Sequence, residues 1–138
     1  MSLVLDSSVA LAWVYSDETT TAVDEVFATI AKGGAWVTSF WKLEVANVLE
    51  MGVRRGRHTA DFRDATLGDL ALLSIATDGE TERQAWGETL QLASRHRLTV
   101  YDAAYLELAK RRVLALATLD EALRSAGRAE GVQLLGVR

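Results

Sequence analysis

The sequence has 138 residues, of which 49% are hydrophobic, and this suits one domain with a substantial core. It contains no cysteine, which excludes a disulfide framework and a thiolate metal site. Its net charge of -4 argues against a simple protein that coats duplex nucleic acid, because such proteins are usually basic. The chain shows no signal peptide and no apolar run of ~20 residues, so we expect a soluble cytoplasmic protein without a membrane span.

The first third of the chain predicts a strand followed by two helices. Residues 2–5 are apolar and predict a buried strand, and the next three residues, Asp6-Ser7-Ser8, are all good N-cap residues. The apolar stretch Val9–Tyr15 predicts a short buried helix. Ser16-Asp17-Glu18 is expected to cap a second helix, which the pair of glycines in Lys32-Gly33-Gly34 ends.

The middle of the chain predicts two more strands separated by helices. The second strand is expected over Ala35–Thr38, and Ser39 is expected to cap a helix from Trp41 to Arg55. Thr59–Leu70 predicts a weaker helix. The apolar run Leu72–Ile75 predicts the third strand.

The last part of the chain continues the alternation of helices and strands. We expect a long helix over Glu80–His96, a helix over Tyr101–Arg112, a strand over Leu114–Ala117, a short helix over Leu119–Ser125 and a last strand over Val132–Leu135. Strands that alternate with helices predict an α/β fold, in which helices cover both faces of a mostly parallel sheet. No linker or repeat divides the sequence, so residues 1–138 are predicted to form one domain.

Four acidic residues occupy related places in this pattern. Asp6 and Asp120 directly follow predicted strands, Asp102 follows a brief apolar run, and Glu44 lies one turn into the helix after the second strand. In an open parallel sheet, ligands bind beyond the carboxyl ends of the strands. We therefore expect these four side chains to converge at one edge of the sheet.

Each acid also has a purely structural interpretation. An acidic side chain at a helix N-terminus gains ~0.3–1 kcal/mol from the helix dipole, and Thr99 with Asp102 fits a capping-box pattern. Taken singly, Asp6, Asp102 and Asp120 fit a capping role and Glu44 fits a solvated helix face. Taken together, four acids on one rim repel one another unless a positive charge lies among them.

A divalent cation is the candidate for that positive charge. A site made of carboxylates, with no cysteine and no nearby histidine, favours Mg²⁺ or Mn²⁺ over zinc. Such ions bind phosphates and activate water, so the four acids predict a phosphodiester hydrolase.

At these residues the sequence resembles the PIN domain family, and in particular the VapC-type ribonuclease toxins of type II toxin–antitoxin pairs. The matching stretches are Val4–Val9, Leu43–Leu49, Thr99–Ala109 and Leu116–Asp120. They occur in the order found in the family and extend over nearly the whole chain. The stretch Thr99–Ala109 is the most specific of the four.

The resemblance implies a PIN-like three-layer fold and a metal-dependent endoribonuclease with Mg²⁺ or Mn²⁺ as cofactor. It implies RNA as substrate, a small antitoxin as partner, and a homodimer or a larger toxin–antitoxin assembly. Asp6 and Asp102 match the principal metal-binding acids of the family, and Glu44 and Asp120 match the other two acids. The supporting candidates are Thr118, Ser8 and Asn47; Thr118 matches a hydroxyl position beside the last acid, and Asn47 shares a helix face with Glu44.

Two other functions remain open at this stage. A phosphoryl-transfer hydrolase of the haloacid-dehalogenase type also places an aspartate after the first strand, but it requires a second aspartate where this chain has Ser8. A PIN-like scaffold that only binds a partner is the non-enzymatic alternative. The presence of all four acids argues against that scaffold.

The tryptophans and the basic clusters also have purely structural interpretations. Core packing is expected of the four tryptophans, including Trp86 on the predicted Glu80–His96 helix. The basic clusters around residues 54–57, 95–97 and 110–112 lie near expected helix C-termini, where cations are favoured, although contact with RNA phosphates is the alternative.

Overall fold

The computed structural model of this chain describes residues 1–137. The elements in chain order are β1 (Leu3–Leu5), α1 (Ser7–Val14), α2 (Thr21–Gly33), β2 (Ala35–Val37), α3 (Trp41–Arg54), α4 (Ala60–Ala71), β3 (Ile75–Thr77), α5 (Thr81–Gln84), α6 (Glu88–His96), α7 (Val100–Arg112), β4 (Ala115–Ala117), α8 (Glu121–Ala129) and β5 (Leu134–Leu135).

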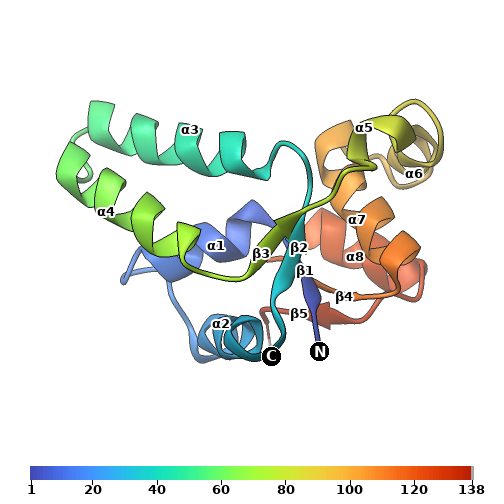
Figure 1. The fold of residues 1–138 in the computed structure, drawn as a ribbon. Coiled ribbons are helices and arrows are strands. Elements are labelled where there is room, and N and C mark those ends of the chain that lie inside the picture. The colour runs from blue at the N-terminus through green and yellow to red at the C-terminus, as the bar shows by residue number, and fades with distance from the viewer. Residues whose placement is uncertain (138) are drawn as a thin grey trace.

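The described strands form one sheet in the order β3-β2-β1-β4-β5, and each neighbouring pair is parallel. Helices α1 to α4 lie on one side of this sheet and α5 to α8 on the other (Figure 1). This division follows from right-handed crossovers that run outward from β1 in both directions. The predicted three-layer α/β fold is confirmed.

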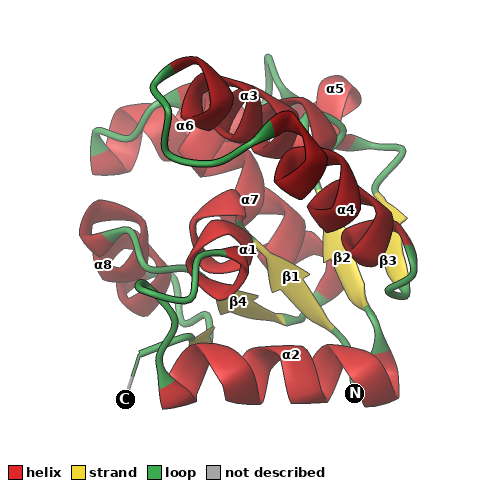
Figure 2. Cartoon of the chain, turned by 90° about the vertical axis from the view of Figure 1, so that its left-hand side faces the viewer, coloured by secondary structure: helices red, strands yellow, loops and turns green. Residues whose placement is uncertain are grey.

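Because the strands are parallel, their carboxyl ends meet at one edge of the sheet. Figure 2 shows the arrowheads of β1, β2 and β3 pointing to that edge, which is where α3 begins. The central strands β1 and β4 are completely buried, which explains why both sequences are purely apolar.

Threonine and aspartate caps set where several of the helices begin. The side chains of Asp6, Thr20, Thr59, Thr99 and Asp120 each accept a hydrogen bond from a backbone N–H in the first turn of the following helix. Such caps satisfy donors that the helix itself leaves unpaired. Two of the predicted acids, Asp6 and Asp120, are therefore helix caps as well as candidate site residues.

Helix α7 is the best buried helix of the fold. Its residues 103–109 are all buried, and the helix packs against β1, β4, α6 and α8. Apolar residues on every side make it a central element, so its N-terminus at Asp102 has little freedom to shift.

The prediction of one continuous helix over Glu80–His96 is wrong. The structure has two helices, α5 and α6, separated by a turn at residues 85–87. Gly87 takes φ -110° and ψ -111°, which is outside the helical region and ends the periodicity. Trp86 in this turn is 94% exposed, so its expected core packing is also wrong.

Several predicted boundaries and caps also differ from the structure. Leu72 and Leu73 form the turn that ends α4, and β3 begins only at Ile75. Thr20 caps α2 in place of Ser16-Asp17-Glu18, and α3 begins after Phe40 without a side-chain cap from Ser39. Within residues 1–137, no helix is both long and apolar enough to cross a membrane.

Candidate active site

The four predicted acids lie at or beside the carboxyl edge of the sheet. Asp6 ends β1, Asp120 follows β4 and caps α8, and Glu44 and Asp102 lie in the first turns of α3 and α7. The charges of Asp6 and Asp102 both act on Glu44, and those of Asp6 and Asp120 both act on Asp102. The fold therefore brings four acids from distant parts of the sequence into one electrostatic group.

Asp6 is the most enclosed of these acids, with 4% of its surface exposed. Its Oδ1 accepts hydrogen bonds from the Ser8 backbone N–H at 3.1 Å and the Ser7 hydroxyl at 3.2 Å. Its Oδ2 accepts from the hydroxyls of Ser8 at 3.0 Å and Thr118 at 2.5 Å. These donors, which come from the first two residues of α1 and from the segment between β4 and α8, hold the carboxylate in one orientation.

Ser8 and Thr118 hold Asp6 through the same pattern of hydrogen bonds. The Ser8 hydroxyl accepts the Leu119 N–H at 3.0 Å, and the Thr118 hydroxyl accepts the Asp120 N–H at 3.1 Å. Each hydroxyl thus receives a backbone proton and directs its own proton at Asp6. This arrangement joins the β1–α1 turn to the β4–α8 turn, and it gives two of the predicted supporting residues a definite place beside the acids.

Glu44 is half-buried, and its Oε1 accepts a hydrogen bond from the Tyr105 hydroxyl. Burial raises the pKa of Glu44, and the charges of Asp6 and Asp102 raise it further, although hydrogen bonds with Tyr105 and Ser7 lower it. Tyr105 is absent from the predicted set of site residues. Its apolar neighbours on α7 indicate a core residue, and only the packing of α7 against α3 shows what its hydroxyl contacts.

Asp102 is also half-buried, and its backbone N–H donates to the Thr99 hydroxyl at 3.1 Å. Burial raises the pKa of the Asp102 carboxyl, and the nearby charges of Asp120 and Asp6 raise it further. Both half-buried acids are therefore held in surroundings that disfavour their negative charge.

The remaining two candidates differ in their surroundings. The Asp120 Oδ2 accepts the Leu123 N–H at 2.8 Å, so Asp120 serves as a cap while its charge acts on Asp102. Asn47 is exposed and lines a groove with Tyr15 and Val48 between α1 and α3. The structure brings Asp120 to the acid group and gives Asn47 no hydrogen bond to it.

No arginine or lysine of residues 1–137 forms an ion pair with any of the four acids. The oxygen atoms of these four carboxylates are donors of the kind that Mg²⁺ and Mn²⁺ prefer. Within the same residues, no three acidic or histidine side chains form a ready-made cage for an ion.

A model of the family described as PIN domain matches residues 3–129 of the sequence. The chain belongs to the PIN domain family. A search of curated proteins finds no match to it. In this PIN domain, the first and last of the four acids both lie within the matched residues.

Solved structures with a similar fold include three with TM-scores above 0.6. PAE2754 from Pyrobaculum aerophilum has a TM-score of 0.64 at 18% identity, covering 91% of this chain and 84% of that one. VapBC2 from Rickettsia felis, bound to a DNA fragment from their promoter, has 0.67 at 14% identity, covering 97% of each chain. FitAcB from Neisseria gonorrhoeae has 0.67 at 15% identity, covering 97% and 96%. At these identities the likeness concerns the fold of the PIN domain.

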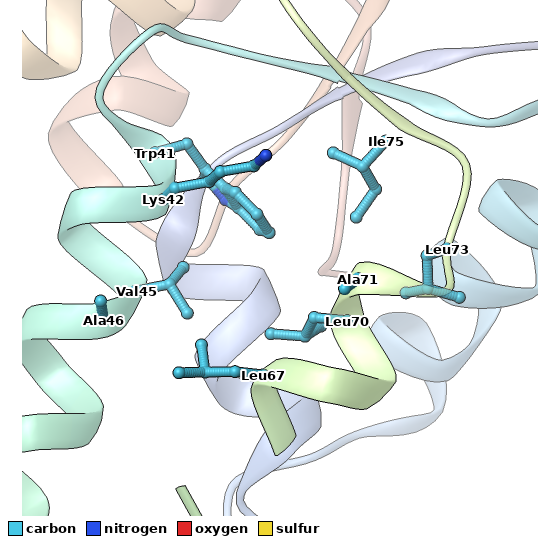
Figure 3. Close-up of a pocket in the computed structure, with 9 residues that line it drawn as sticks. All are labelled: Trp41, Lys42, Val45, Ala46, Leu67, Leu70, Ala71, Leu73 and Ile75. Carbon is cyan, nitrogen blue, oxygen red and sulfur yellow. The ribbon is translucent and has the colours of Figure 1, made fainter. Parts of the chain in front are cut away.

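The PIN domain also has an apolar cavity of about 370 Å³ that contains none of the four acids. It lies between α3, α4 and β3, and Figure 3 shows Trp41 and Val45 facing Leu67 and Leu70 across it. Because none of the four acids lines it, this cavity is not part of the candidate active site.

The basic clusters mostly serve the fold of the PIN domain. Arg57 pairs with Asp17 and Glu18. Lys110 pairs with Glu130, and the two arginines after it pair with Asp78. These ion pairs favour the structural interpretation of the clusters that contain them.

Proposed function

We propose that this PIN domain is a metal-dependent endoribonuclease and the toxin of a type II toxin–antitoxin pair. One observation carries the proposal: four acids from separate elements share one edge of the sheet, and no arginine or lysine of the described residues 1–137 pairs with them. Such an arrangement costs the fold stability unless a cation binds there. Enzymes that hydrolyse phosphodiester bonds commonly use several carboxylates to bind a divalent cation.

Membership of the PIN domain family supports the nuclease part of the proposal. The toxin part is supported by the resemblance to VapC-type toxins around Asp102 and by the similar fold of VapBC2 and FitAcB. On this proposal, the partners are an RNA substrate, a small cognate antitoxin, and a second copy of the chain in a homodimer or larger assembly.

The four acids have distinct parts in the proposed reaction. Asp6 and Asp102 are the principal ligands of the cation, and Glu44 and Asp120 complete the negative surface around it. A bound Mg²⁺ or Mn²⁺ supplies charge neutralisation at the phosphate and a lowered pKa for water. Ser8 and Thr118 hold Asp6 in a fixed orientation, so this ligand needs no rearrangement when the ion arrives.

The test is cleavage of end-labelled structured RNA by the purified, partner-free protein. Reactions contain Mg²⁺, Mn²⁺ or a chelator, and they compare the wild type with Asp102→Asn and with Asp69→Asn. Asp69 is an exposed acid on α4, so Asp69→Asn removes the same charge away from the site. We expect cleavage that needs the metal, falls on the order of 100-fold or more in Asp102→Asn, and is retained in Asp69→Asn.

Other outcomes would contradict separate parts of the proposal. Metal-dependent cleavage that survives in Asp102→Asn would remove the four acids from the reaction. A wild type that neither binds Mn²⁺ nor cuts any RNA of a broad panel would favour the non-catalytic scaffold.

A further inference from the structure

The Tyr105 side chain is a buried phenol that reaches into the acid group. Only 1% of Tyr105 is exposed, and its hydroxyl donates to Glu44 Oε1. A buried hydroxyl without a partner is costly, so the bond holds both side chains in place. It also joins two elements from opposite sides of the sheet, because Tyr105 lies on α7 and Glu44 on α3.

Glu44 needs such a partner more than the other acids do. Its side chain has three rotatable bonds, and the charges of Asp6 and Asp102 both repel its carboxylate. Asp6 is held by four hydrogen bonds, and Asp120 is held as a helix cap. The hydroxyls of Tyr105 and Ser7 both act on the Glu44 carboxyl as hydrogen-bond partners, and Tyr105 has the larger effect of the two.

The Tyr105 ring is itself held in place. Phe40, the residue before α3, meets the Tyr105 ring edge-on with centroids 5.7 Å apart and planes at 80°. The same Phe40 ring meets Tyr101 edge-on at 5.4 Å. The start of α3 is therefore clamped to the first two turns of α7 by aromatic contacts beside the hydrogen bond.

Helix geometry places this restraint where it can act on two acids together. Asp102 and Tyr105 are three residues apart, so they share one face of α7. The buried body of α7 thus fixes Asp102 directly and Glu44 through the Tyr105 hydroxyl. The Tyr105 hydroxyl contacts only one of the two carboxylate oxygens of Glu44, Oε1.

We propose that Tyr105 is a positioning residue, which holds one oxygen of Glu44 so that the other faces a divalent cation bound by Asp6 and Asp102. This inference rests on the proposed function. Residues that orient metal ligands in this way commonly contribute 10–100-fold to metal affinity or activity.

The experiment compares Tyr105→Phe with Tyr101→Phe, because each substitution removes one hydroxyl and leaves the ring that contacts Phe40. Mn²⁺ binding is measured by titration calorimetry on the purified chain, and kcat and KM are measured with RNA. For Tyr105→Phe we expect Mn²⁺ binding roughly 10–100-fold weaker and a lower kcat with unchanged KM. For Tyr101→Phe, whose side chain is exposed, we expect wild-type values.

A second pair of variants separates positioning from a general loss of structure. If Tyr105 acts through Glu44, then adding Tyr105→Phe to Glu44→Gln weakens Mn²⁺ binding no further. Losses that add in the double variant would overturn the inference, and so would wild-type Mn²⁺ affinity in Tyr105→Phe. If Tyr105→Phe does not fold, Glu44→Asp tests the same contact, since it keeps the charge and draws it away from the Tyr105 hydroxyl.

The calorimetric readout also keeps this inference separate from the proposed function. A wild type that binds Mn²⁺ but cuts no RNA contradicts the nuclease and leaves the positioning of Glu44 supported or refuted by the affinities alone. A wild type that binds no Mn²⁺ overturns both.

Discussion

Two buried aspartates of this chain have opposite surroundings. Asp78 and Asp6 are 1% and 4% exposed, and each accepts several hydrogen bonds. The donors to Asp78 are two arginines and a threonine, at 2.7 to 3.1 Å, whereas the donors to Asp6 are hydroxyls and one backbone N–H. One carboxylate is neutralised by the protein and the other is not.

The difference in surroundings shifts the pKa values of the acids in the two regions in opposite directions. Burial alone would raise the pKa of Asp78, but hydrogen bonds from Arg111, Thr81 and Arg112 together lower it to about 2. At the sheet edge, burial and neighbouring acids raise the pKa of Glu44 and Asp102. Asp78 is a buried acid paired with arginines of the same chain, whereas the acids at the sheet edge have no such partner among residues 1–137, as the proposed metal site requires.

Among the changes that distinguish the Asp78 region from the acid group at the sheet edge, Asp78→Asn is expected to have the largest effect on stability. This substitution removes the common anion of the partly buried Arg111 and Arg112, and although Glu107 still pairs with Arg111, it costs about 3 kcal/mol of unfolding free energy. Equilibrium urea unfolding measures the loss, and Asp69→Asn on the exposed face of α4 is the control. A loss below 1 kcal/mol would make Asp78 no more structural than a surface acid.

The pH dependence of stability gives the next largest effect. The pKa of Asp78 lies below 3.8, its usual value, so its stabilising contribution is complete above that pH and is lost as pH falls toward 2. The loss amounts to about 2–3 kcal/mol. Urea unfolding near pH 5 and near pH 2 measures it; the gap between wild type and Asp78→Asn is expected to narrow at the lower pH. Glu130, whose pKa is also about 2, titrates alike in both proteins.

Asp120 offers a smaller effect that separates capping from charge. Asp120→Ala removes the cap of α8 and is expected to cost about 1 kcal/mol, while Asp120→Asn keeps a good cap and changes stability by only a few tenths. Both variants are expected to lose RNA cleavage if the carboxylate serves the cation. Thermal unfolding and the cleavage assay, run on the same preparations, compare the two roles; full activity in Asp120→Asn would leave Asp120 as a cap only.

The smallest expected effect is an increase in stability, in Asp102→Asn. An acid with a raised pKa destabilises the folded state above that pKa, so the metal-free Asp102→Asn protein is expected to be more stable at neutral pH, by about 1 kcal/mol or less. Added Mn²⁺ is expected to raise the Tm of the wild type and not of the variant. A less stable Asp102→Asn would mean that Asp102 is a structural acid like Asp78.

The sequence predicted the acids better than it predicted their supports. Asp6 and Asp120 could be found because each follows an apolar strand directly, and a parallel sheet collects such positions at one edge. The contact of Tyr105 with Glu44 could not be found, because it joins residues 61 apart and depends on the angle between α3 and α7. Local patterns carry no information about that angle.

The ion pairs of Asp78 could not be predicted from the sequence either. Asp78 precedes Gly79, a pair typical of a surface turn, and Arg111 and Arg112 fit the solvated end of a helix. Only the assembled fold brings them together, with the Arg112 guanidinium 3.4 Å above the Trp36 ring. The exposed Trp86 is the converse case, since a large apolar side chain in a periodic stretch lies outside the core because Gly87 ends the helix.

The hydrogen bond between Thr118 and Asp6 also determines when the site can exist during synthesis. The two residues are 112 positions apart, and β4 must pair with β1 before the hydroxyl can reach the carboxylate. A ribosome makes Asp6 well before it makes Thr118. Until β4 has been made and has paired with β1, the growing chain therefore lacks the assembled acid group, so on the proposed function it cannot cleave the messenger RNA that is being translated.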